Sequence, residues 1–188
     1  MAADVGGVRA CVVHEVVGED LTRPEREPGP SVVAEVVMVW AHEAAQLDVE
    51  ALTGGRPATG YRVEERPQWD DGPPADGVTR ISFVRRRPGL TRRQFADHWT
   101  NVHAPLARRH HPALCRYVQN VVVEPVTPGA AEVDGIAELG FRSIEDMTAR
   151  MYDSPEGAAI IRADVHRFID TDTGWRVLTR PSSRPTNP

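Results

Sequence analysis

The chain has 188 residues, of which 40% are apolar and 26% are charged, a composition typical of one globular domain or of two very small ones. All 22 basic residues are arginine, which excludes chemistry that needs a lysine, such as a Schiff base or a P-loop. The net charge of −5 argues against a nucleic-acid partner, and no apolar run approaches the length of a membrane span. Because the N-terminal segment also lacks the pattern of a secretory signal, we expect a cytoplasmic protein.

The N-terminal third of the chain predicts three short strands and one helix. We expect strands at residues 8–17, 31–41 and 60–67, and a helix at residues 42–53. The second strand is apolar on both faces apart from Glu35, which indicates that both of its faces are covered. Gly54 is a suitable end for the helix, and residues 68–78, rich in turn residues, predict a linker.

The remainder of the chain predicts strands and helices in the order β-α-β-β-α-β. The first helix has an unusually clear beginning: Thr91 and Gln94 can form a capping box, and Leu90 can pack on Phe95. Two further helix starts are indicated by Ser143 and by Ser154 before a proline, and the last seven residues predict a disordered tail. The strands are expected at 80–86, 114–123, 133–141 and 174–181. This order is that of a ferredoxin-like α+β domain.

Three segments of the N-terminal part recur, in the same order, in the C-terminal part. GYRVEERP at 60–67 matches GWRVLTRP at 174–181, and residues 12–17 and 34–35 correspond to residues 117–122 and 137–138. The repeats predict a truncated copy at 8–67 (β-β-α-β) and a complete copy at 79–181. Two antiparallel sheets could then cover each other as a tandem pseudo-dimer within one chain, forming a dimeric-type α/β barrel. The alternative is that two strand-rich segments of one valine- and arginine-rich chain look alike.

The C-terminal part resembles the EthD domain of the dimeric α/β-barrel superfamily, with arginine where lysine is common in the family. The matching segments are residues 82–91 (SFVRRRPGLT), Phe95, Trp99, 102–106 (VHAPL), 116–118 (RYV) and 134–139 (DGIAEL). The resemblance implies a small cytoplasmic barrel. Some relatives are linked to ether-degrading monooxygenase systems, and others are cofactor-free decarboxylases, isomerases, cyclases or dehydratases acting on aromatic or polyketide-like substrates. The N-terminal copy matches weakly and lacks the histidine segment.

His103 is the first candidate for catalysis. The apolar face of its helix comprises Phe95, Trp99, Val102 and Leu106. At 100° per residue, His103 lies about 80° from Phe95, at the margin of that face, where an imidazole suits general acid or base work. Pro105 is expected to kink the helix and to release the carbonyl of Asn101. The alternative is a structural histidine that bonds a neighbouring strand.

Three further histidines lie near His103, at positions 98, 110 and 111. His98 lies on the other margin of the apolar face, which favours a solvent-facing role. It is five residues before His103 and therefore about 140° away on an α-helix, which argues against a zinc site. His110 and His111 indicate a basic cluster at the helix C-terminus. We expect no metal and no organic cofactor.

Two carboxylates complete the predicted catalytic set. Glu138 lies on an apolar strand and Asp134 lies four residues earlier, so either could orient His103 or hold Arg85 or Arg116, and a purely structural ion pair is equally compatible. The residues predicted to contact substrate are Phe95, Trp99, Tyr117 and Arg85, although packing in the core is the simpler prediction for the three aromatic residues. His14, on the first strand, could reach the interior of the barrel, although a structural role is the simpler prediction.

Three functional hypotheses follow. The first is a cofactor-free lyase, isomerase or cyclase that uses His103 on a hydrophobic, oxygenated, aromatic or polyketide-like substrate. The second is an oxidoreductase-linked role, either monooxygenase-like or accessory to an oxygenase system. The third is a ligand-binding barrel without catalysis. In each case the expected partner is a small hydrophobic molecule, with no nucleic acid and no membrane, and the intrachain pseudo-dimer could associate further as a homodimer.

Overall fold

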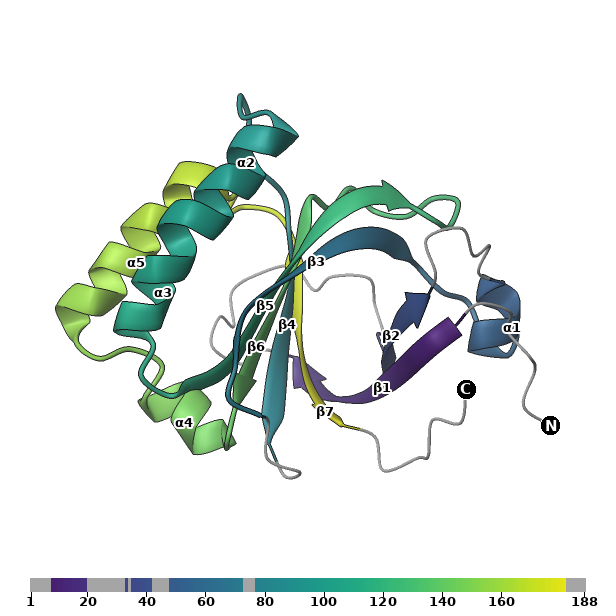
Figure 1. Ribbon diagram of the computed structural model, residues 1–188, viewed down its shortest axis with the longest axis horizontal. Helices are drawn as coiled ribbons and strands as arrows, with labels where there is room; N and C mark the ends of the chain where they lie inside the picture. The colour runs from purple at the N-terminus through teal and green to yellow at the C-terminus, as the bar shows by residue number, and fades with distance from the viewer. Residues whose placement is uncertain (1–7, 20–32, 34, 42–47, 73–76, 182–188) are drawn as a thin grey trace.

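The computed structural model describes residues 8–19, 33, 35–41, 48–72 and 77–181 (Figure 1). In chain order the strands are β1 (Val8–Glu19), β2 (Glu35–Ala41), β3 (Tyr61–Asp70), β4 (Val78–Val84), β5 (Leu114–Pro125), β6 (Gly135–Phe141) and β7 (Trp175–Pro181). The helices are α1 (Val49–Thr53), α2 (Arg92–His98), a π-helical turn η1 (Trp99–His103), α3 (Ala104–His110), α4 (Ile144–Ala149) and α5 (Pro155–Phe168). The fold is α+β, as the sequence predicts.

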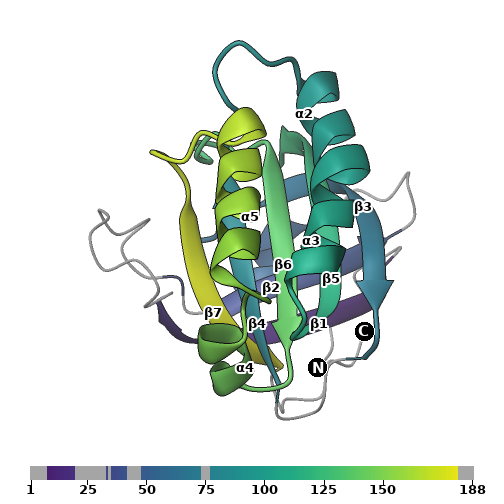
Figure 2. The ribbon, with the colours of Figure 1, turned by 90° about the vertical axis from the view of Figure 1, so that its left-hand side faces the viewer.

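The seven strands of the described residues form one antiparallel sheet in the order β2-β1-β7-β4-β6-β5-β3. The central four strands, β7-β4-β6-β5, come from the predicted β-α-β-β-α-β segment and have the ferredoxin-like order. Helices α2, α3 and α5 cover one face of these strands (Figure 2). The other face is concave, because the sheet curls into a half-barrel (Figure 1).

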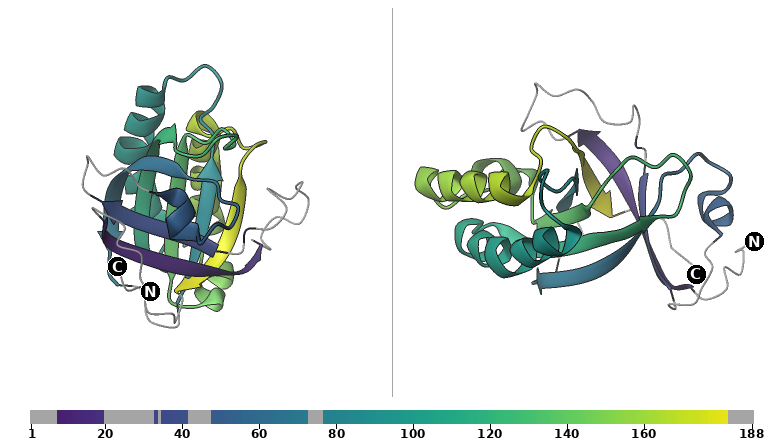
Figure 3. Two further views of the ribbon diagram at one scale, coloured as in Figure 1. Left: turned by 90° about the vertical axis from the view of Figure 1, so that its right-hand side faces the viewer. Right: turned by 90° about the horizontal axis from the view of Figure 1, so that it is seen from above.

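The N-terminal strands do not form a sheet of their own. β1 and β2 extend the central sheet beyond β7, whereas β3 extends it beyond β5. Figure 3 shows these strands curving toward one another on the side away from the helices. Between them, the indole nitrogen of Trp40 on β2 donates a hydrogen bond of 3.0 Å to Glu65 on β3. The expected pseudo-dimer of two facing sheets is therefore not confirmed.

The edge pairings have a reciprocal pattern. β1 carries the segment repeated in β5, and β3 carries the segment repeated in β7. β1 pairs with β7, the counterpart of β3, and β3 pairs with β5, the counterpart of β1. A duplication with exchanged edge strands would produce such a pattern, and the duplication itself stays a prediction.

Several predicted boundaries shift in the N-terminal part. The segment predicted as a linker begins inside β3, which continues to Asp70, and β4 begins at its last residue. Residues 35–40 of β2 are half-buried rather than fully covered. Helix α1 occupies the end of the predicted 42–53 helix and stops at Gly54, whose φ is 62°. Residues 42–47 and the predicted tail at 182–188 lie outside the described residues.

The helix starts behave as the sequence predicts. The Thr91–Gln94 capping box is present, and the hydroxyls of Ser143 and Ser154 accept backbone N–H groups at the beginnings of α4 and α5. The core between helices and sheet is apolar and aromatic, with Phe95, Trp99, Tyr117, Phe141 and Phe168 among its largest members. Among the described residues, no helix is long and apolar enough to cross a membrane.

Candidate active site

A π-helical turn separates α2 from α3 and determines which residues of this helix face the sheet. The N–H of Ala104 donates to the carbonyl of Trp99, five residues earlier, where an α-helix would use a residue four earlier. Pro105 follows directly and has no N–H to donate. The widened turn thus replaces the expected kink and accommodates a proline that would clash with the carbonyl four residues before it.

The turn corrects two predictions about the buried face. Val102 was expected to be buried but is 40% exposed, and Leu106 is half-buried. His103 points inward instead and is 7% exposed. One extra residue in the turn rotates everything that follows, so the 100° spacing that works up to Trp99 fails after it.

The same turn brings His98 and His103 together. The turn inserts one residue into the helix, so residues five apart share a face as residues four apart do in a regular α-helix. Both rings reach the carboxylate of Asp164 on α5. His98 Nε2 lies 2.9 Å from Asp164 Oδ1, and His103 Nδ1 lies 2.9 Å from Asp164 Oδ2. His98 is therefore not simply solvent-facing, although 23% of its side chain is exposed. His103 is oriented by Asp164, not by the predicted Glu138 or Asp134.

The chemistry of the carboxylate fixes the tautomer of His103. Burial alone raises the pKa of Asp164, but the hydrogen bonds from His103 and His98 outweigh it and hold that pKa below its usual value. Asp164 is therefore ionised at neutral pH and can only accept hydrogen bonds. Each histidine must donate to it, so a neutral His103 carries its proton on Nδ1 and has its lone pair on Nε2, as a general base requires.

Tyr117 on β5 lies beside His103, with the two ring centroids 6.4 Å apart. Its phenol oxygen accepts 2.8 and 3.4 Å hydrogen bonds from the Trp99 indole and the Gln119 amide. Burial raises the pKa of Tyr117 to about 12, against the opposing effect of these two donors, so the phenol stays protonated. With its lone pairs occupied, the phenol can direct its own proton toward a further oxygen.

An aromatic ring lies against both histidines. Phe168 lies 5.1 Å from the ring of His103 and 4.8 Å from that of His98, between centroids. Gly135 on β6 allows Trp99 to approach, because a Cβ at this position would lie 2.4 Å from the indole Cζ3. Of the predicted substrate-contacting residues, Phe95, Trp99 and Tyr117 therefore share one buried region with His103.

The other two histidines of the segment are buried, contrary to the prediction of a basic cluster at the helix end. His110 bonds Asp153, just before the start of α5, with Nδ1 at 3.0 Å from Oδ2. His111 Nδ1 donates to the carbonyl of Met151 at 2.6 Å. Burial is the main cause that lowers the pKa of His111 to about 4, so this ring is neutral at physiological pH.

Glu138 lies on the opposite face of the sheet from His103. On β6 it pairs with Val118, whereas its neighbour Leu139 pairs with Tyr117, and adjacent strand residues face opposite sides. Its carboxylate is ion-paired with Arg116 and accepts a 2.7 Å hydrogen bond from Asn120. The structure thus supports a structural pair with Arg116.

His14 reaches this same concave face. It is buried, and its Nδ1 lies 3.5 Å from the hydroxyl of Thr179, which itself donates to the Thr79 carbonyl. Burial lowers the pKa of His14, while Glu138 raises it and Arg116 lowers it. His14 therefore belongs to the surroundings of Glu138 rather than to those of His103.

Asp134 and Arg85 lie in a third place, at the end of the sheet where β4 leads into α2. Asp134 is ion-paired with Arg86 and accepts the Arg86 backbone N–H at 2.9 Å, whereas Arg85 pairs with Glu132. Both residues line a pocket of about 470 Å³, and none of His98, His103, Asp164 or Tyr117 lines it. The predicted catalytic set is thus divided among three regions.

Asp164 is the residue that the sequence analysis missed. A signal was available, because Gly157, Ile161 and Phe168 form the buried stripe of α5 and Asp164 occupies that stripe at helical spacing. An acidic residue on an apolar stripe needs a buried partner. In the described ranges, no group of three or more His, Cys, Asp or Glu side chains is arranged to hold a metal ion.

Comparison with known proteins supports the fold and the family resemblance. Residues 87–172 match the model of the EthD domain, which confirms the resemblance predicted from the sequence. A solved structure described as "Crystal structure study of anthrone oxidase-like protein" is similar over 96% of this chain and 79% of that chain, with a TM-score of 0.61. At 13% sequence identity this likeness shows the fold alone. No curated protein matches the chain.

Proposed function

We propose that this EthD-domain chain is a small enzyme in which His103 abstracts a proton from a carbon next to a carbonyl group. The observation that carries the proposal is the ionised Asp164, which accepts from both histidines and thereby holds the His103 lone pair on Nε2. A positioned general base of this kind contributes about 10²–10⁴-fold to a rate. The π-helical turn supports the proposal, because such turns frequently occur at functional sites.

Tyr117 completes the proposed chemistry. Removing a proton next to a carbonyl places negative charge on the carbonyl oxygen, and a donor aimed at that oxygen stabilises the charge. The protonated phenol of Tyr117, already accepting from Trp99 and Gln119, is such a donor. His103, as imidazolium, then returns the proton at another position or to a leaving group, which gives isomerisation, cyclisation or elimination.

The surroundings favour a flat, hydrophobic substrate with oxygen substituents. The rings of Phe168 and Tyr117 lie beside His103, and those of Phe95 and Trp99 pack against Phe168. In the closed arrangement of the structure these rings pack on one another, so we propose that substrate enters by displacing Phe168, which lies against both histidines. No metal or organic cofactor takes part in the proposed step.

Oxidation is the second candidate, and it is favoured by the structural neighbour, which is described as anthrone oxidase-like. An anthrone is a carbon acid: loss of one proton gives an electron-rich anion that can react with O₂. Conversion of anthrone to anthraquinone consumes one O₂ and releases one water. The same base would then begin an oxidase reaction without a cofactor, with O₂ as the electron acceptor.

One substrate tests both candidates. Anthrone is incubated with the protein in D₂O without O₂, and the exchange of its acidic C–H is followed by NMR. In parallel, O₂ uptake and anthraquinone formation are measured in air. Catalysed exchange alone supports acid/base chemistry, whereas exchange together with O₂ uptake supports the oxidase.

Variants assign the activity to the site. His103→Asn is expected to lower the exchange rate about 10²–10⁴-fold, and Tyr117→Phe is expected to lower it by less. His166→Asn is the matched control, because this histidine is exposed on α5 outside the cluster. If His103→Asn keeps the fold, by circular dichroism, and exchanges at the normal rate, the general-base proposal is wrong and the ligand-binding barrel becomes the better account.

A further inference from the structure

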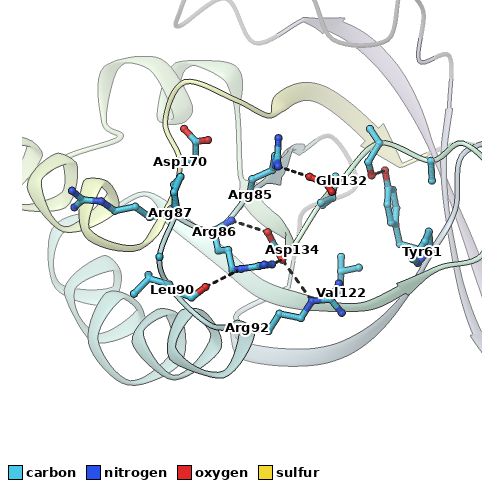
Figure 4. Close-up of a pocket in the computed structure, with 16 residues that line it drawn as sticks. Tyr61, Arg85, Arg86, Arg87, Leu90, Arg92, Val122, Glu132, Asp134 and Asp170 are labelled. Carbon is cyan, nitrogen blue, oxygen red and sulfur yellow. Dashed lines mark hydrogen bonds and ion pairs between the residues drawn. The ribbon is translucent and has the colours of Figure 1, made fainter.

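A pocket of about 470 Å³ lies at the end of the sheet, away from the two histidines (Figure 4). It is formed where β4 leads into α2, beside the connection between β5 and β6 and the start of β3. The charged groups that line it are four arginines (Arg85, Arg86, Arg87, Arg92) and three acids (Glu132, Asp134, Asp170). In a chain with a net charge of −5, this pocket carries a positive formal balance.

Arg86 and Asp134 bind each other and have a structural role. The 9% exposed carboxylate of Asp134 is paired with Arg86, and the Arg86 Nε also donates to the Leu90 carbonyl at 3.0 Å. The Asp134 carboxylate additionally accepts the Arg86 backbone N–H. These contacts form the floor of the pocket and fix the chain between β4 and α2.

Two other arginines are held much less firmly. Arg85 is paired with Glu132, but these side chains are 42% and 79% exposed, and such surface pairs contribute little stability. Arg92 donates to the Val123 carbonyl at 2.8 Å and lies 3.9 Å from Asp134, which leaves most of its five N–H donors for other acceptors. Figure 4 shows Arg87 and Asp170 on the side of Arg86 that is farther from Tyr61.

The opposite wall of the pocket is apolar. It includes the ring of Tyr61 from β3 and Val122 and Pro125 from β5. The Tyr61 hydroxyl donates to the Ala131 carbonyl at 2.8 Å, which fixes the ring in place. A concave site with an apolar wall and a few convergent charged groups is the usual form of a small-molecule site.

We propose that this pocket binds an organic anion, in which an apolar body lies against Tyr61 and a carboxylate or phosphate group is held by Arg85 and Arg92. Planar guanidinium groups bind both kinds of oxyanion through paired hydrogen bonds. The ligand's anionic group displaces Glu132 from Arg85. Binding at this pocket requires no chemistry at His103 and is independent of the proposed reaction.

Calorimetric titration with four probes tests the proposal. The probes are 2-naphthoate, 2-naphthyl phosphate, uncharged 2-naphthamide and inorganic phosphate. We expect one or both naphthyl anions to bind, and the tighter of the two identifies a carboxylate or a phosphate ligand. Binding of the amide as tight as that of the anions, or no binding by either naphthyl anion, would overturn the proposal.

Three variants and a control locate the binding. Arg85→Gln and Arg92→Gln each remove a charged hydrogen-bond donor and are expected to weaken binding about tenfold or more. Glu132→Gln removes the competing carboxylate and is expected to tighten binding by about two- to fivefold. Arg150→Gln, an exposed arginine paired with Asp146 outside the pocket, is expected to change nothing. If Arg150→Gln weakens binding as much as Arg85→Gln, or if Glu132→Gln weakens it, the site is not this pocket.

Discussion

His111 makes the stability of this protein depend on pH in a way that can be calculated from its surroundings. The ring lies at the end of α3 and donates to the Met151 carbonyl. Burial is the main cause that lowers the pKa of His111 from 6.5 to about 4; the bond to Met151 opposes this, and electrostatic interactions with Arg80, His103 and His110 lower it further. In the unfolded chain the ring regains its ordinary pKa.

The sign follows from proton binding. As pH falls from 6.5 toward 4, the unfolded chain binds a proton at His111 while the folded chain does not, so acidification favours unfolding. Each pH unit within that interval costs about 1.4 kcal/mol, which amounts to roughly 3 kcal/mol over the whole interval. Above the ordinary pKa this contribution no longer changes with pH.

Urea unfolding of the wild type and of His111→Asn, between about pH 7.5 and pH 4, measures this effect. Asparagine keeps an N–H donor for Met151 but does not titrate. We expect the difference in unfolding free energy between the two proteins to change by roughly 3 kcal/mol in favour of the variant as pH falls. His166→Asn, at an exposed position, is the control and should follow the wild type. Parallel curves for the wild type and His111→Asn would refute the reasoning.

Three further substitutions test contacts around the candidate site. Gly135→Ala places a Cβ 2.4 Å from the buried Trp99 ring and should lower the urea midpoint, at a cost of about 1–3 kcal/mol. Gln119→Leu removes the 2.9 Å hydrogen bond to the Trp99 carbonyl, which keeps the Ala104 N–H, and should cost about 0.5–1.5 kcal/mol in the same assay. Asp164→Asn should be less stable than the wild type at neutral pH. Because the folded pKa of Asp164 is lowered from 3.8, the wild-type advantage should disappear as the pH falls below that value, which acid unfolding curves would show.

Local signals are sufficient to predict the order of elements in the C-terminal part. The capping box at Thr91 and the serine caps at Ser143 and Ser154 determine helix starts through hydrogen bonds within a few residues, so the sequence contains all that is needed. The placement of β1 and β3 is different. Each strand pairs with a strand more than 40 residues away in the chain, and composition does not determine which edge of a sheet it joins.

The candidate site shows a second limit of prediction. Glu138 and Asp134 are the acidic residues that follow the histidine segment in the family pattern. Because side chains alternate along β6, however, Glu138 faces the side of the sheet opposite to His103. Asp134 is ion-paired with Arg86 instead. The true partner of His103 lies 61 residues away, on a helix that follows two strands. Family motifs indicate which segments recur, whereas the partner of a buried histidine depends on how two helices pack.

The π-helical turn offers a direct test of why the helical spacing fails after Trp99. If the turn is one residue inserted into an α-helix, deleting exposed Asn101 should restore an α-helix in which His98 and His103 are four apart and still share Asp164. Pro105 would then interrupt a regular helix, so the deletion alone should cost about 3 kcal/mol. Combining it with Pro105→Ala should recover most of that loss, since Pro105 is exposed.

Urea unfolding measures the stability of both deletion variants, and NMR of the imidazole N–H protons reports whether Asp164 still accepts from the two rings. The control is Pro105→Ala in the full-length chain, which should retain both hydrogen bonds. If the double variant is as unstable as the deletion alone, or folds without those imidazole signals, the turn does more than accommodate a proline. The wide turn itself would then be what holds His103 against Asp164.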